Sequence, residues 1–366
     1  MEETDIRTPL EREVSEHPAA EALDLLKLIY QNEFGCGHLI CDPKENLRRL
    51  RAEVEELPKD QGEVRVQPIG NGLCRLPLSL LRHSGLRTET AQKLFLLTAE
   101  QPRGSREGFL QKVSELQVWL EERGGPVRPE EVSAALRRWQ LEGESPFRHS
   151  AGYRRLYAPA YRVLEERYCA FLPLFGAIDA RLRRGEPFRV AIDGNCAAGK
   201  STLAALLNRV YGCPVIPMDH FFLRPDQRTP ERLAEPGGNV DYERFAQEVL
   251  RPLLKTGRAC YRPYDCGTRM LADPVEVPPA PFWVVEGSYS LHPTLRDGYD
   301  LKVFLSVEPE EQLRRIERRN GPAMLERFRH EWIPMEERYF STYAVRSGCT
   351  LHFPEDRELP PDHWEG

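Results

Sequence analysis

The chain has 366 residues, of which 40% are hydrophobic, and its 57 acidic and 51 basic side chains give a net charge of −6. This length fits two average domains, and no apolar run reaches the roughly 20 residues that a membrane-spanning helix needs. Because the charges are mixed along the chain, the sequence argues against a broad surface for nucleic acid.

The cysteines and the amino terminus indicate the cellular compartment in which the protein is expected. The nine cysteines are odd in number and follow no repeating spacing, which does not suggest a disulfide framework. The amino terminus is acidic and polar, unlike a secretory signal. We therefore expect a reduced, cytoplasmic protein without a membrane partner.

Residues 18–140 carry a mainly helical pattern. Apolar side chains recur there at steps of three and four residues, which predicts amphipathic helices. The segments with this spacing are 19–34, 43–57, 106–123 and 129–143. We expect a mainly α-helical amino-terminal domain over 1–150, followed by a connecting helix over 151–185. The sequence leaves the role of the amino-terminal domain open, and dimerisation is one option.

The stretch NEFGCGHLICDPKENL, residues 32–47, is the most unusual part of this half. Cys36, His38 and Cys41 are of the residue types that bind zinc, but no matching second pair stands at ligand spacing. The favoured interpretation is a tight glycine turn between two helices, with the cysteines as small hydrophobic side chains. His38 stays a candidate ligand contact, because loops often carry function.

From residue 186 the pattern changes to short, branched apolar runs that alternate with helical segments. The runs are FRVAI, PVIPM, FWVVEG and LKVFLSV, and they resemble strands buried on both faces. Strands that alternate with helices predict an α/β fold around a largely parallel sheet. We place this domain at residues 186–366.

The stretch IDGNCAAGKST follows the first predicted strand and fits the pattern G-x-x-x-x-G-K-[ST] completely. Its glycines allow successive N–H groups to form an anion nest, and the next helix adds the positive end of its dipole. We expect Lys200 to reach the β- and γ-phosphates and Ser201 to ligate Mg²⁺. The predicted nucleotide site consists of Gly194, Asn195, Cys196, Ala197, Ala198, Gly199, Lys200, Ser201 and Thr202.

Two carboxylates follow predicted strands and complete the candidate site. Asp219 comes directly after PVIPM, at the sheet edge where α/β proteins bind ligands. A carboxylate there can accept the proton of an attacking hydroxyl, although a turn cap or a water-mediated Mg²⁺ contact is the alternative. Glu286 ends the strand FWVVE. Because an unpaired buried carboxylate is costly, we expect a metal or another cation beside it.

The loop together with MDHFF, PGGNVDYERF, YDCGTRM, FWVVEG and LKVFLSVEPEEQLRRIERRN makes residues 186–355 resemble the uridine kinase/phosphoribulokinase family of P-loop kinases. The resemblance implies a P-loop NTPase fold of the nucleoside-kinase type, with ATP and Mg²⁺ as cofactors. It implies that Asp219 is the catalytic base and that Glu286 organises Mg²⁺. By the same resemblance the acceptor would be bound by Asp219, Asp241, Tyr264 and Arg269, and the lid arginines would be Arg315, Arg318 and Arg319.

The expected function is ATP- and Mg²⁺-dependent phosphoryl transfer to a hydroxyl of a small molecule. A nucleoside such as uridine or cytidine is the first choice of acceptor. Nicotinamide riboside, pantothenate-like compounds and sugar phosphates stay open. A nucleotide-gated binding protein without kinase turnover is the alternative from another class. A plain GTPase is disfavoured, because no N/T-K-x-D motif for guanine occurs.

Overall fold

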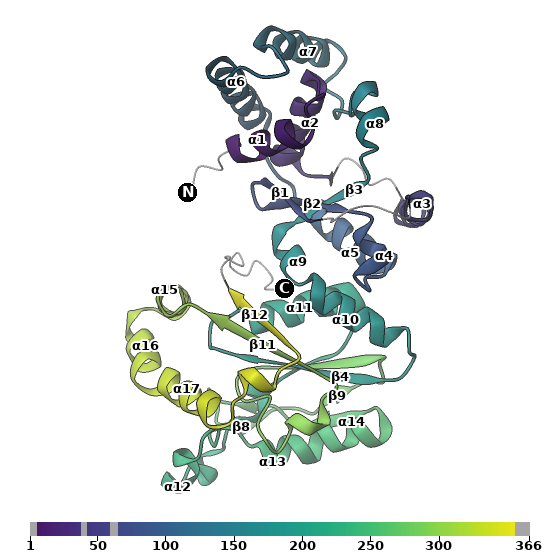
Figure 1. The fold of residues 1–366 in the computed structure, drawn as a ribbon. Coiled ribbons are helices and arrows are strands. Elements are labelled where there is room, and N and C mark those ends of the chain that lie inside the picture. Colours follow the sequence, from purple (N-terminus) through teal and green to yellow (C-terminus); the bar gives the residue numbers. More distant parts are fainter. Residues whose placement is uncertain (1–5, 38–41, 59–64, 356–366) are drawn as a thin grey trace. The chain divides into compact units, whose positions relative to one another are not determined.

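The structure is a computed structural model that describes residues 6–37, 42–58 and 65–355 (Figure 1). It divides into two compact units, Met1–Ala180 and Arg181–Gly366, called unit 1 and unit 2 below. The division falls inside helix α10, near the end of the segment expected to connect two domains. In the described ranges, no helix combines the length and the apolar character needed to cross a bilayer.

Unit 1 combines helices with a small sheet. Its helices are α1 (Arg7–Glu16), α2 (Ala22–Phe34), α3 (Pro43–Glu56), α4 (Leu80–His83), α5 (Thr88–Ala99), α6 (Arg106–Arg123), α7 (Pro129–Leu141), α8 (Ala151–Tyr157), α9 (Glu166–Ala170) and α10 (Leu172–Leu182). The strands pair antiparallel in the order β1 (Gln67–Gly70), β2 (Leu73–Pro77) and β3 (Tyr161–Glu165). Helices α2, α3, α6 and α7 confirm the helical segments expected from the apolar spacing.

The sheet of unit 1 differs from the sequence expectation, which took residues 1–150 as mainly α-helical and 151–185 as a connecting helix. Asn71 and Gly72 both have positive φ, 54° and 65°, and they turn β1 into β2. An Asn-Gly pair between apolar runs is a hairpin signal. Residues 161–165 then pair with β2 instead of continuing a helix. Here the cross-strand partner overrides the local helical pattern.

Unit 2 is built on a parallel sheet. Its strands in that sheet are β4 (Phe188–Gly194), β5 (Val215–Pro217), β10 (Phe282–Glu286), β11 (Leu301–Val307) and β12 (Leu351–Glu355). The short strands β6 (Ala259–Tyr261) and β9 (Val275–Val277) form one antiparallel pair, and β7 (Tyr264–Asp265) and β8 (Met270–Leu271) form another.

The helices of unit 2 lie in the connections between the strands of the parallel sheet. The α-helices are α11 (Lys200–Tyr211), α12 (Pro230–Ala234), α13 (Tyr242–Phe245), α14 (Arg251–Thr256), α15 (Pro309–Asn320), α16 (Pro322–Arg327) and α17 (Ile333–Thr342). Two π-helical segments, η4 (Ala246–Leu250) and η6 (Phe328–Trp332), join neighbouring helices. The 3₁₀ turns are η2 (Met218–Phe221), η3 (Pro225–Gln227), η5 (Arg296–Gly298) and η7 (Arg346–Gly348).

The parallel sheet has the order β12-β11-β4-β10-β5, which confirms the predicted α/β fold. Figure 1 shows α11 on one face of this sheet and α13 and α14 on the other. The chain leaves β4 toward β5 on one side and reaches β11 on the other side. Such a switch in direction opens a crevice at the carboxyl end of the central strand, where open α/β sheets bind ligands.

Replacing Val284 by alanine tests the centre of this sheet. Val284 on β10 is 0% exposed and lies between Val190 and Val215 on the adjacent strands. Loss of two buried methyl groups should lower the free energy of unfolding by about 2–3 kcal/mol. The same change at Val275, which is 39% exposed on β9, should stay within about 0.5 kcal/mol. Urea unfolding measures both, and equal losses would contradict this account.

Candidate active site

The loop of residues 195–199 joins the carboxyl end of β4 to α11. Gly194, Ala197 and Gly199 have positive φ values of 139°, 61° and 85°. Such left-handed positions turn neighbouring N–H groups toward one side of a loop. A Cβ atom at Gly194 would collide with the carbonyl oxygen of Leu305 on β11. The first glycine of the motif is therefore required by the sheet itself.

The end of this loop carries hydrogen-bond donors without acceptors. Gly199 is the N-cap of α11. Within the described part of the chain, no acceptor is bonded to the main-chain N–H of Gly199, Lys200 or Ser201. Donors at the start of a helix are a ready anion site. The Lys200 side chain is only 8% exposed, and its Nζ donates to the carbonyl oxygens of Gly194 and Asn195 at 2.8 Å each.

Side chains from two neighbouring strands lie beside this loop. Ser201 Oγ donates to Glu286 Oε2 at 3.1 Å. Glu286 ends β10 and pairs with Pro217 on the adjacent strand β5. Asp219 comes two residues after Pro217, at the same edge of the sheet as Glu286. Burial raises the pKa of Glu286, the Lys200 ammonium opposes this, and the Asp219 carboxylate adds to it. The predicted loop, base and metal residues are thus brought together.

The oxygen atoms of Ser201 and Glu286 are of the kind that Mg²⁺ prefers. Among the residues with described positions, no cluster of three or more His, Cys, Asp or Glu could hold a metal. Magnesium commonly binds through one or two protein oxygens and completes its shell with phosphate and water. Ser201 and Glu286 fit this mode, with the ion shared with a nucleotide.

The first half of the loop is held by side chains that the sequence did not reveal. Glu336 on α17, 5% exposed, accepts the Cys196 N–H at 2.9 Å and the Ser288 hydroxyl at 2.6 Å. Gln312 on α15 donates to the Cys196 carbonyl oxygen at 3.0 Å. We call Gln312, Ser288 and Glu336 the loop clamp. It bonds Cys196, and the N–H groups of residues 199–201 have no acceptor among the residues that the structure describes.

One signal for the clamp is present in the sequence. Gln312 lies one helical turn before Ile316, which is 0% exposed, and Gln312 itself is 4% exposed. A polar residue on the apolar face of an amphipathic helix indicates a specific partner. Ile316 forms an apolar cluster with Leu325 and Phe328, and Cys196 and Ala197 pack against this cluster. Burial raises the pKa of the Cys196 thiol, as expected for a small side chain that fills space beside this cluster.

Asp193 anchors the loop from below. It is 0% exposed, and its Oδ1 accepts the N–H of Gly194 at 2.7 Å and of Tyr289 at 3.2 Å. Its Oδ2 accepts the Leu291 N–H and the Tyr339 hydroxyl, both at 2.9 Å. Burial raises the pKa of Asp193 to about 6, against the four donors and the Lys200 charge. One carboxylate thereby joins β4, the turn after β10, and α17.

The three arginines expected to form a lid lie along one side of α15. Arg315 Nη1 donates to the Ala197 carbonyl oxygen at 3.3 Å, and its Nε bonds Glu311 at 2.7 Å. Arg318 and Arg319 are exposed in the last turn of the helix. The structure therefore brings Arg315 to the loop and leaves the other two at the surface.

Asp241, expected near the acceptor, is 3% exposed and caps α13. Its Oδ1 accepts the Arg244 N–H at 3.1 Å, and its Oδ2 accepts the Gln227 amide at 2.7 Å. Both oxygens are thus bonded within the protein. In this structure Asp241 orders the segment around it.

Tyr264 and Arg269 belong to the β7–β8 hairpin. Tyr264 is 7% exposed, and Arg269 lies in the turn with φ of 59°. Burial raises the pKa of the Cys266 thiol in this turn, and the nearby Asp219 carboxylate adds to the shift. Strand β7 of this hairpin packs beside η2, the turn that contains Asp219.

Two predicted zinc candidates, His38 and Cys41, lie outside the described residues. Cys36 is 1% exposed, and its Sγ donates to the Val163 carbonyl oxygen at 3.5 Å. Burial raises the pKa of its thiol to about 12. Cys36 is therefore a protonated core side chain in this structure.

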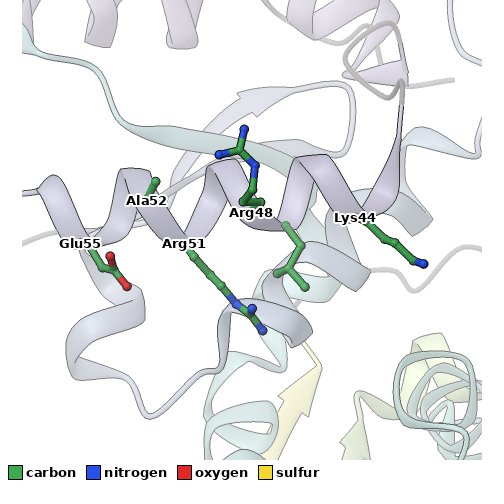
Figure 2. Close-up of a pocket in the computed structure, with 6 residues that line it drawn as sticks. Lys44, Arg48, Arg51, Ala52 and Glu55 are labelled. Carbon is green, nitrogen blue, oxygen red and sulfur yellow. The ribbon is translucent and has the colours of Figure 1, made fainter.

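A hollow of about 460 Å³ lies along α3 in unit 1 (Figure 2). Its lining comes from one helix and consists of Lys44, Leu47, Arg48, Arg51, Ala52 and Glu55. Arg48 bonds Glu45 at 2.6 Å, and Arg51 bonds Glu89 at 2.6 Å. The hollow contains none of the predicted site residues, and acids already pair these two arginines.

No protein-family model matches the chain. A possible uridine kinase from Bacillus stearothermophilus is similar with a TM-score of 0.38 and 18% identity, covering 49% of this chain and 98% of that one. A Silicibacter protein described as a fructose transport system kinase gives 0.37 and 23%, covering 47% and 92%. D-glycerate 3-kinase from Cryptococcus neoformans gives 0.33 and 17%, covering 47% and 87%.

Replacing Asp193 by asparagine tests the anchor beneath the loop. The amide keeps the shape, but its NH₂ group faces donors and leaves a buried N–H without an acceptor. We expect a loss of about 2 kcal/mol in unfolding free energy and weaker ATP binding. Asp297→Asn, at an exposed site in η5, is the matched control. Urea unfolding and titration calorimetry measure both effects; unchanged values in Asp193→Asn would contradict the anchoring role.

Proposed function

We propose that unit 2 transfers the γ-phosphoryl group of ATP to a hydroxyl of a small molecule, with Mg²⁺ as cofactor. The observation that carries the proposal is the set of main-chain N–H groups at residues 199–201 that find no acceptor in the described ranges, with the Lys200 side chain beside them. Asp219 and Glu286 stand at the same edge of the sheet. A mere phosphate-binding turn would not need both carboxylates.

The residues divide the chemistry as follows. The main-chain donors and Lys200 hold the phosphates, and Ser201 and Glu286 hold or orient Mg²⁺, which neutralises charge on the β- and γ-phosphates. Asp219 accepts the proton of the attacking hydroxyl. Arg315, next to the loop, stabilises charge on the transferred group, and Arg318 and Arg319 reach it only if α15 moves.

We propose a nucleoside, uridine- or cytidine-like, as the acceptor. The support is the resemblance of the motifs around Asp219, Tyr264 and Arg269, and the closeness of the β7–β8 hairpin to Asp219. Asp241 contributes by holding Gln227 and Arg244 beside this region. The similar structures include proteins named for fructose and glycerate, so a panel of acceptors must include sugars and hydroxy acids.

Replacing Asp219 by asparagine separates a kinase from a nucleotide-gated binding protein. A kinase loses its general base, so kcat should fall by about 10²-fold or more while ATP affinity stays within about twofold. Asp273→Asn, at an exposed turn before β9, is the control. ATP consumption is measured against a panel of nucleosides, vitamins and sugars. Equal turnover in both variants, or no turnover of any acceptor by the unchanged protein, would contradict the proposal.

Replacing Glu286 by glutamine tests the metal role. The amide removes a charge next to the expected Mg²⁺ but keeps the size of the side chain. The Mg²⁺ concentration for half-maximal activity should rise about tenfold or more, and saturating Mg²⁺ should restore much of kcat. Glu276→Gln, exposed on β9, should leave the Mg²⁺ dependence unchanged. A Glu286→Gln variant with the original Mg²⁺ dependence would contradict this role.

A further inference from the structure

The peptide unit that joins Cys196 to Ala197 in the glycine-rich loop is held in a strained conformation. Ala197 has a φ of 61°, in the left-handed region that a Cβ atom disfavours. Backbone strain of this kind persists only where the surrounding contacts hold it, and it is concentrated at ligand-binding sites. Ala197 belongs to the predicted nucleotide site, but the chemistry proposed above does not explain its conformation.

Side chains from two helices bond both main-chain polar groups of Cys196. Gln312 on α15 is 4% exposed, and its Nε2 donates to the Cys196 carbonyl oxygen at 3.0 Å and to Cys196 Sγ at 3.1 Å. Because a carbonyl oxygen only accepts, the amide nitrogen of Gln312 must face it. Glu336 on α17 accepts the Cys196 N–H at 2.9 Å. These contacts fix the peptide units on both sides of Cys196.

The groups that follow along the loop are bonded as well, with one exception in the described ranges. Arg315 follows Gln312 by three residues on the same face of α15, and its Nη1 donates to the Ala197 carbonyl oxygen at 3.3 Å. The Ala198 N–H donates to the Asn195 carbonyl oxygen at 3.1 Å. The Ala197 N–H between them has no acceptor among the described residues. It is thus available to a ligand, like the donors of residues 199–201.

The direction of the Ala197 N–H is set by Gln312. The Cys196 carbonyl and the Ala197 N–H belong to one planar trans peptide unit, so they point in opposite directions. Because Gln312 holds the carbonyl toward α15, the N–H points away from α15. A rotation of this unit by about half a turn would bring φ of Ala197 to about −120°, an ordinary extended value, and would turn the N–H toward α15. Gln312 therefore holds the less favourable of two orientations.

Stability alone does not explain a glutamine at this position. Gln312 lies on the face of α15 that carries Ile316, which is 0% exposed and belongs to an apolar cluster. An apolar side chain of similar length would fill the same space, and the loop would then relax to an unstrained backbone. A buried amide that keeps a neighbouring backbone strained is expected where the strained form has a use.

We propose that Gln312 is a positioning residue for the nucleotide. It keeps the Ala197 N–H turned toward the phosphates, so that this donor acts together with the main-chain donors of residues 199–201. Gln312 acts through the peptide unit that it holds, without touching the nucleotide itself. The inference rests on the function proposed for unit 2, because it requires a phosphate ligand in this loop.

The first experiment replaces Gln312 by methionine in the full-length chain. Methionine keeps the length and volume of the side chain but has no donor, so the peptide unit can turn. ATP with Mg²⁺ should then bind at least about fivefold more weakly. Titration calorimetry measures the Kd. Gln247→Met, exposed in η4, is the matched control and should leave the Kd within about twofold.

The same replacement in an Ala197→Gly background separates positioning from packing. Glycine adopts positive and negative φ about equally, so it removes the strain that Gln312 opposes. In this background, Gln312→Met should weaken ATP binding by at most about twofold, compared with at least about fivefold when Ala197 is present. A side chain that only packed α15 against the loop would give the same loss in both backgrounds.

Amide hydrogen exchange in the unchanged protein gives a measurement that needs no variant. Mass spectrometry with fragmentation resolves the exchange of single residues. ATP with Mg²⁺ should slow the exchange of the Ala197 amide about tenfold or more, because the bound phosphates accept its hydrogen bond. The Cys196 amide, bonded to Glu336, should exchange slowly with and without ATP.

The outcomes separate this inference from the proposed function. An unchanged Kd in Gln312→Met, an equal loss in both backgrounds, or an Ala197 amide that ATP does not protect would overturn the inference and leave the proposed function in place. If the unchanged protein did not bind ATP, the proposed function would itself be wrong, and the inference with it.

Discussion

The hydrogen bonds of the Asp193 carboxylate are the interaction on which the candidate site of unit 2 depends. It lies in the sheet directly before the glycine that cannot carry a Cβ, and it accepts four hydrogen bonds from three elements. A neutral side chain could not satisfy four donors at once. Asp193 therefore holds the end of β4, the turn after β10 and helix α17 together. The loop of residues 195–199 starts from this fixed strand end.

Much of unit 2 follows from local sequence. The glycine-rich loop of residues 195–199, the four strands β4, β5, β10 and β11, and helix α11 could be predicted, because glycines, branched apolar runs and helix spacing act over few residues. The loop clamp could not, since Glu336 and Gln312 lie 140 and 116 positions from Cys196. The role of Asp193 could not be predicted either, because its donors Tyr289, Leu291 and Tyr339 are distant in the sequence. Asp241 shows the opposite case, because its motif indicates a ligand contact and the structure bonds both its oxygens internally.

The packing of unit 1 depends on buried polar side chains, so less of its structure can be predicted from the sequence. Helix α2 buries Asp24, Gln31, Asn32 and Glu33, so a hydrophobic pattern describes only part of its packing. The partners of Asp24 and Gln31 come from β2 and from residues 149–161, and His149 and Tyr161 are more than a hundred positions away. Asn32 and Glu33 bond instead to Ile69 on β1 and to Lys112 on α6. Polar residues with such distant partners leave no periodic signal.

The direction of helix α17 depends on the π-helical segment η6 that precedes it. The segment η6 between α16 and α17 is wound with one extra residue per turn relative to an α-helix. Each residue of an α-helix rotates the chain by about 100°, so the extra residue sets the direction of everything after it. Glu336 faces Cys196 only with that residue in place. A deletion of one residue within Phe328–Trp332 would give a more regular helix whose carboxylate and tyrosine, Glu336 and Tyr339, no longer meet the loop and its buried anchor.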